Sequence, residues 1–184
     1  MDLFQAIRER RSVRKYKATP VSQEQLNAIF DAVRWTPSWA NTQCWSFVVV
    51  REGETKERLA DTLPPVNRAA EAIKNAPIVI VACAQMGRSG YIRGALGSDK
   101  GDWFMFDLGL AMQNLTLAAH ALGLGTVHVG WFDAAKVAQI LEVPEGIAVV
   151  EMTPLGRPDD QPVAPRRKEL GEFVFYEKYD QGKS

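Results

Sequence analysis

Apolar residues recur at helical spacing in some segments of the chain and form short β-branched runs in others, which predicts a domain that mixes helices with strands. Helices are expected at residues 2–11, 22–35, 54–63, 66–75, 102–122 and after Asp133. Strands are expected at residues 47–50, 78–83, 126–130 and 147–152. We find no repeat and no second domain, so the sequence predicts one domain that spans residues 1–184.

Three of these segments carry more specific information. Ser22 followed by Gln25 forms a capping box, which sets the start of its helix. The run 78–83 is apolar at every position, so it is expected to be a central strand that is buried on both faces. The helix 102–122 is apolar over so wide an arc that it must be buried on most sides, either within the domain or between subunits.

Two other segments have less regular patterns. Residues 87–101 contain five glycines together with Arg88, Tyr91 and Arg93, which predicts a mobile loop that is either a lid or a flexible surface excursion. The proline-rich tail from residue 157 ends in an apolar, β-prone stretch, which stays ordered at a chain end only when it docks onto something. A partner subunit is one simple docking surface.

Composition and charge exclude several classes of protein. Lysines and arginines number 22, as do the acidic residues, so no global field favours nucleic acid or a membrane surface. The longest apolar run is too short to cross a bilayer, and the first residues lack the pattern of a secretory signal. Cys44 and Cys83 are expected to be buried, reduced thiols. We therefore expect a cytoplasmic protein with no nucleic-acid or membrane partner.

The usual catalytic motifs are missing from the sequence. His120 and His128 stand alone, so no metal site is predicted, and His120 is expected to be a packing residue. A nucleophile elbow and a P-loop are absent, and the Gly123–His128 stretch lacks the third glycine of a dinucleotide-binding turn. No side chain is assigned a catalytic role.

Basic residues gather at the end of the first predicted helix. These are Arg8, Arg10, Arg11, Arg14 and Lys15, with Ser12 among them. Arginine binds phosphate oxygens in bidentate fashion, and a hydroxyl adds a donor. A run of this kind can equally be a solvated face. A second basic cluster at residues 166–168 favours a bound phosphate.

The loop 36–45 is the second candidate site. It lies between a predicted helix and a predicted strand and carries the small polar residues Ser38, Asn41 and Gln43 between two tryptophans. Such a loop suits a flat ring with heteroatoms on its edge. It can also be a turn held by core tryptophans. Together with a phosphate site, it predicts a cofactor of mononucleotide size.

The sequence resembles the nitroreductase family in motifs that follow one another along most of the chain. They are Arg10–Tyr16 with Pro20-Val21, Pro37–Val49, Asp107 with Gln113–Leu115 and Gly123–Thr126, and Pro154–Pro158 with Arg166–Lys168. The resemblance implies an α+β fold with a mostly antiparallel central sheet wrapped by helices. It also implies an intertwined homodimer, with helix 102–122 in the interface and residues 157–184 as an arm that embraces the partner and extends its sheet.

The family likeness also implies a site for FMN that is shared between the two subunits. The residues implied for its phosphate, ribityl chain and pyrimidine edge are Arg10, Arg11, Ser12, Arg14, Arg166 and Arg167. The residues implied for the isoalloxazine ring, from the other subunit, are Pro37, Ser38, Asn41 and Gln43. The backbone N–H groups of Val129 and Gly130 would approach flavin N5 and O4, and Asn67 is a further candidate at the ring edge.

The activity implied is that of an FMN-dependent oxidoreductase. It would take hydride from NADH or NADPH and reduce nitroaromatics, quinones or similar flat acceptors by a ping-pong mechanism. Two departures from the family pattern are Cys44, in a place usually held by proline, and Trp39, in place of a small residue. Substrate oxidation or dehalogenation on the same scaffold, and flavin binding without turnover, remain alternatives.

Overall fold

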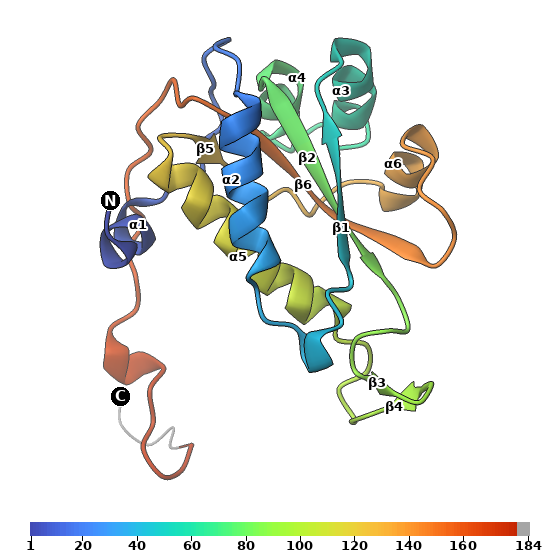
Figure 1. Ribbon diagram of the computed structural model, residues 1–184. Coiled ribbons are helices and arrows are strands. Elements are labelled where there is room, and N and C mark those ends of the chain that lie inside the picture. Colours follow the sequence, from blue (N-terminus) through green and yellow to red (C-terminus); the bar gives the residue numbers. More distant parts are fainter. Residues whose placement is uncertain (180–184) are drawn as a thin grey trace.

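Strand β2 (Ile78–Gln85) determines the layers of the fold through its alternating side chains. Ile78, Ile80 and Ala82 belong to one apolar cluster, whereas Val79 and Val81 belong to another. All five are exposed by 1% or less. The computed structural model, which describes residues 1–179, therefore has a sheet that is covered by helices on both faces (Figure 1).

The main sheet has four strands in the order β1-β2-β6-β5, and every neighbouring pair is antiparallel. Besides β2, its strands are β1 (Trp45–Val50), β6 (Ile147–Gly156) and β5 (Gly125–Thr126). A parallel bridge between Ser12 and Thr126 adds the N-terminal segment beside β5. The mostly antiparallel sheet and the central position of β2 are both confirmed.

The helices divide between the two faces of the sheet. Side chains of α2 (Gln23–Arg34) and α5 (Phe104–Ala121) pack on one face. Those of α3 (Gly53–Ala60), α4 (Ala70–Asn75) and α6 (Ala134–Ile140) pack on the other. The short helix α1 (Leu3–Glu9) contacts α5. Among the helices of residues 1–179, none is long and apolar enough to cross a lipid bilayer.

The capping box of α2 is confirmed. The Ser22 side chain accepts a hydrogen bond from Gln25 N, and the Gln25 side chain accepts one from Ser22 N, both at 3.2 Å. Two of the polar groups that a helix start leaves without partners are thereby satisfied.

The structure differs most from the prediction at three boundaries. The helix expected at 66–75 begins only at Ala70, because the side chain of Asn67 accepts from Ala69 N and stabilises a turn before it. The strand expected at 126–130 is reduced to β5 and one bridge between Val129 and Met152. The last strand extends beyond 152 to Gly156, because it pairs with both β2 and β5.

The loop predicted at residues 87–101 contains regular structure, and its mobility stays a prediction. It contains a small hairpin of β3 (Tyr91–Ile92) and β4 (Ala95–Leu96). Its two turn residues, Arg93 and Gly94, have φ values of 51° and 82°, as a tight hairpin turn with two positive φ angles requires. The Arg93-Gly94 pair was the signal for this turn.

The tail leaves the sheet after β6 and runs past α1 (Figure 1). It contains one short helical turn, η2 (Leu170–Glu172), and exposes Val163, Leu170 and Tyr176 by 91%, 72% and 85%. The apolar stretch 173–176 is not a strand in the single chain. Of the expected arm 157–184, residues 180–184 lie outside the described residues. Its docking onto a partner stays a prediction.

Candidate functional site

The basic segment follows α1 and enters the fold beside β5. Val13 is buried, and its N–H donates to Thr126 O at 2.9 Å. A side chain at Gly125 would meet Val13 at less than 3 Å, so glycine is needed for this close approach. The Tyr16 hydroxyl donates to Val13 O at 2.6 Å, and burial raises the pKa of this phenol. These contacts anchor the backbone that carries the arginines.

Four of the predicted cationic residues converge on one cavity of about 280 Å³. Its lining includes Arg10, Arg11, Ser12, Arg14, Arg167 and prolines of the tail. Arg166 is exposed and does not line this cavity. The structure thus brings residues 10–14 and 167 together, although some 150 residues separate them in the chain.

The charges in this cavity are not neutralised by any ion pair within the described part of the chain. Over residues 1–179, no carboxylate forms an ion pair with the arginines that line it. The pKa of Arg10 is lowered, first by burial and then by the positive charges of Arg11 and Arg167. Guanidinium groups that repel each other in this way form a site for an anion with several oxygens, such as a phosphate group.

The loop 36–45 has a strained backbone. It contains the short helical turn η1 (Trp39–Asn41), and Ala40, Asn41 and Gln43 have φ values of 44°, 55° and 46°. Each such residue costs on the order of 1–3 kcal/mol and persists only where the surroundings fix it. Ser38 Oγ accepts from Gln43 N at 3.0 Å, and Gln43 Nε2 donates to Asn41 Oδ1 at 3.1 Å. Pro37, Asn41 and Gln43 remain exposed. The loop therefore presents polar groups in a fixed arrangement.

A single chain does not bring the two clusters together. The loop is anchored to Asp107, near the start of α5, whereas His120, near the end of α5, lines a cavity with Arg10 and Arg11. Thirteen helical residues correspond to about 20 Å. The cavity that holds the arginines includes no residue of the loop 36–45.

The segment 128–131 passes along the edge of β6, and the structure corrects one predicted role there. The N–H of Val129 donates to Met152 O at 3.0 Å, so it is not available to a ligand. The next two residues, Gly130 and Trp131, donate to no backbone oxygen within the described part of the chain. Asn67 supports this segment, since its Nδ2 donates to Trp131 O at 3.1 Å.

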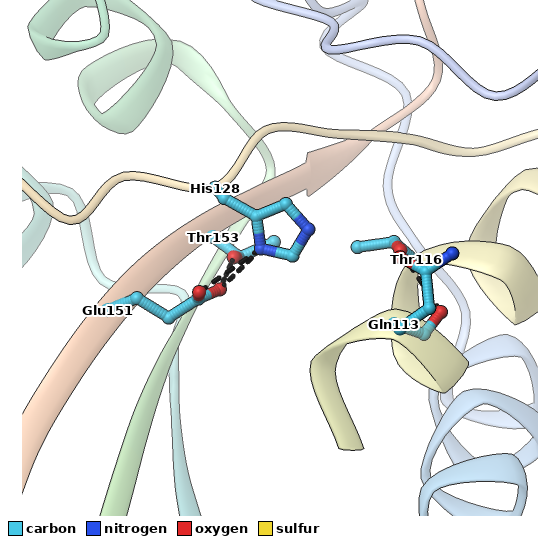
Figure 2. A network of polar contacts seen from close by, with 5 residues as sticks. All are labelled: Gln113, Thr116, His128, Glu151 and Thr153. Atoms are coloured by element: carbon cyan, nitrogen blue, oxygen red, sulfur yellow. Dashed lines mark hydrogen bonds and ion pairs between the residues drawn. The ribbon is translucent and has the colours of Figure 1, made fainter. Parts of the chain in front are cut away.

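A polar network that the sequence did not reveal lies beside Gly130. Figure 2 shows His128, Glu151 and Thr153 on the sheet, with Gln113 and Thr116 on α5 opposite. Nδ1 of His128 lies 2.8 and 3.1 Å from the two carboxylate oxygens of Glu151, and Thr153 Oγ1 donates to Glu151 at 2.8 Å. Because a carboxylate only accepts, it fixes Nδ1 as the N–H of the ring.

The register explains why these side chains meet. Val129 pairs with Met152, so the residues on either side of that bridge, including His128, Glu151 and Thr153, project from the same face of the sheet. In the sequence, the available signal was that Glu151 and Thr153 are two residues apart, which places them on the same face of a strand. It could be used only once the pairing partner of β6 was known.

Comparisons with known proteins agree with this architecture. The family model described as the nitroreductase family matches residues 7–63 and 64–157. A protein of Methanothermobacter thermautotrophicus, whose name refers to NADH dehydrogenase and NAD(P)H nitroreductase activity, is 33% identical over 166 residues, which are 88% of this chain and 80% of the relative.

Two solved structures have the same fold. A nitroreductase family protein from Clostridium novyi aligns with a TM-score of 0.80 and 30% identity, over 95% of this chain and 93% of that one. The NADPH:FMN oxidoreductase of Vibrio harveyi, in complex with NAD⁺, aligns with a TM-score of 0.81 and 29% identity, over 97% and 78%. The fold is that of an α+β nitroreductase-like protein. The chain belongs to the nitroreductase family.

Proposed function

We propose that this chain is an FMN-dependent oxidoreductase. It takes hydride from NADH or NADPH and reduces flat acceptors such as nitroaromatics or quinones by a ping-pong mechanism. The observation that carries the proposal is the cavity lined by Arg10, Arg11, Ser12, Arg14 and Arg167, whose charges form no ion pair with a carboxylate of residues 1–179. The relatives support it, since they include a protein named as an NADPH:FMN oxidoreductase.

The residues present fit FMN at both of its ends. The arginine cavity suits the phosphate, with Arg166 close by in the tail. Pro37, Ser38, Asn41 and Gln43 would meet the ring from the partner subunit. The N–H of Gly130, in place of that of Val129, would face flavin N5 or O4, with the N–H of Trp131 beside it, because these two donors have no backbone acceptor among residues 1–179. Asn67 would hold that segment in position.

The proposal requires a homodimer, because the two halves of the site lie at opposite ends of α5. Apolar surface suited to an interface is present on α1, where Leu3, Phe4 and Ile7 are exposed by 62%, 69% and 49%. Phe106 on α5 and the tail expose further apolar side chains. Exposed apolar patches of this kind are typical of protein interfaces.

The bound cofactor would supply the redox chemistry, and the protein would supply binding, orientation and shielding from water. No side-chain acid or base is assigned in this reaction. The Gly130 N–H would polarise the ring, and the arginines would neutralise the phosphate.

The experiment that tests the proposal begins with the visible spectrum of the purified protein after addition of FMN. We expect a yellow complex that bleaches with NADH or NADPH under anaerobic conditions and recovers its colour when a quinone or nitroaromatic is added. Parallel lines in double-reciprocal plots would support the ping-pong order. A protein that stays colourless with added FMN would refute the proposal, and a yellow protein that NAD(P)H does not bleach would indicate flavin binding without this turnover.

A further inference from the structure

Donors from two different loops converge on the carboxylate of Asp107, which is 1% exposed near the start of α5. Trp39 N lies 3.1 Å from both of its oxygens, Ser89 Oγ donates to it at 2.5 Å, and Thr42 Oγ1 at 3.4 Å. The Cys44 thiol lies at 3.8 Å. Over residues 1–179 no cationic side chain forms an ion pair with Asp107, so these donors stabilise the buried carboxylate.

The donors come from two segments, the loop that the proposed function places at the flavin ring and the hairpin segment 87–101. Trp39 and Thr42 belong to the loop 36–45, and they flank two of its three residues with positive φ angles, Ala40 and Asn41. Ser89, which is fully buried, belongs to the hairpin segment 87–101. Its carbonyl accepts from Trp103 N at 3.0 Å, which closes the base of that segment.

A second contact joins the same two segments. The indole of Trp39 packs against that of Trp103, which lies just after the hairpin segment at the start of α5, with ring centroids 5.2 Å apart. The Trp39 ring also lies against the backbone at Gly97, where an added side chain would approach it to 3.1 Å. Trp39 thus fills the space between the loop and the hairpin segment. The resemblance to the family implies a small residue at this position.

We propose that Asp107 is a positioning residue that holds the loop 36–45 in the conformation that meets the flavin ring. The same carboxylate couples this loop to the segment 87–101, so that loosening one loosens the other. The identity of the ligand rests on the proposed function. In a dimer, Asp107 of one subunit would act on the flavin bound by its partner.

The first test is Asp107→Asn, which keeps the shape of the side chain but replaces one acceptor oxygen with a donor amide. Hydrogen exchange of the protein without FMN should become at least about tenfold faster in both segments, because several shared hydrogen bonds are lost. The dissociation constants of FMN and riboflavin should rise together, by about tenfold or more, since the loop meets the ring and not the phosphate.

The matched control is Thr116→Val, a nearly isosteric change elsewhere on α5 at a buried residue whose hydroxyl, among residues 1–179, bonds only to Gln113 O in its own helix. It should leave exchange in both segments and flavin affinity unchanged. If Thr116→Val produces the same changes as Asp107→Asn, the effect is a general loosening of α5, and the positioning role is wrong.

The second test is Ser89→Ala, which removes a donor from the segment 87–101 only. Coupling predicts faster exchange in the loop 36–45 as well, and a rise of about threefold or more in both flavin dissociation constants. Faster exchange confined to 87–101 would overturn the coupling. Unchanged flavin affinity in a folded Asp107→Asn dimer would overturn the positioning role. If Asp107→Asn does not fold, Ser89→Ala decides.

Failure of this inference can be distinguished from failure of the proposed function. Exchange in the protein without FMN tests the hydrogen-bond coupling even if no flavin binds. Failure of the wild-type protein to bind FMN would refute the proposed function and the ligand-positioning role, but not the coupling.

Discussion

Replacing Arg10 with methionine tests the anion site, because the change removes one positive charge and keeps most of the aliphatic stem. Arg10 is half-buried at the end of α1 and lines the cavity with Arg11 and Arg167. Its lowered pKa reflects burial and repulsion from these two arginines. Because the change removes a charge that is repelled by Arg11 and Arg167, the melting temperature of the protein without FMN should stay the same or rise. The affinity for FMN should fall.

The size of that fall follows from the contact that is lost. A hydrogen bond to a charged group contributes about 1.5–3 kcal/mol. This corresponds to a rise of about 10- to 150-fold in the dissociation constant of FMN. Riboflavin has no phosphate, so its dissociation constant should change by less than about threefold. High ionic strength should weaken FMN binding to the wild type more than to Arg10→Met, because salt screens the removed charge.

Quenching of flavin fluorescence measures the dissociation constants of FMN and riboflavin, each at low and at high ionic strength. Lys17→Met is the matched control, since Lys17 is exposed and does not line the cavity. Lys17→Met should leave the dissociation constants of FMN and riboflavin unchanged. Equal weakening of FMN and riboflavin by Arg10→Met, or no weakening at all, would refute the assignment of Arg10 to the phosphate.

Three further predictions concern stability and the cofactor segment. Ser22→Ala removes half of the capping box and should lower the free energy of unfolding by about 1 kcal/mol, seen in urea as a lower midpoint with an unchanged slope. Asn67→Ala loses the bond to Trp131 O and should weaken FMN and riboflavin binding equally, by about three- to tenfold in fluorescence titrations; weakening of FMN alone would contradict this role. Burial raises the pKa of Cys44 and Cys83 from 9.0 to about 11, so neither thiol should react with iodoacetamide at neutral pH until the protein unfolds. Because the folded pKa is the higher one, the stabilising contribution is complete below pH 9 and is lost as the pH rises through 11; a double alanine variant whose stability falls as steeply above pH 9 would contradict it.

Local chemistry was sufficient for much of the fold. The capping box at Ser22 acts between residues three apart, and the apolar run at 78–83 requires burial on both faces wherever it is placed. Both predictions were confirmed for this reason. The boundaries near Ala70 and Val129 were wrong because a turn stabilised by Asn67 and a pairing with Met152 override the local pattern.

The cluster of five cations at the end of the first helix and the polar loop between two tryptophans can both be read from the amino-acid sequence, since both are local in the chain. Which of these groups lie close together in space depends on the tertiary structure. Arg167 joins Arg10 through the path of the tail, and Asp107 reaches Trp39 across 68 residues. Likewise, His128 meets Glu151 only through the register of one bridge. Side-chain patterns indicate which face is buried, but the pairing of distant segments depends on the three-dimensional packing of the whole domain.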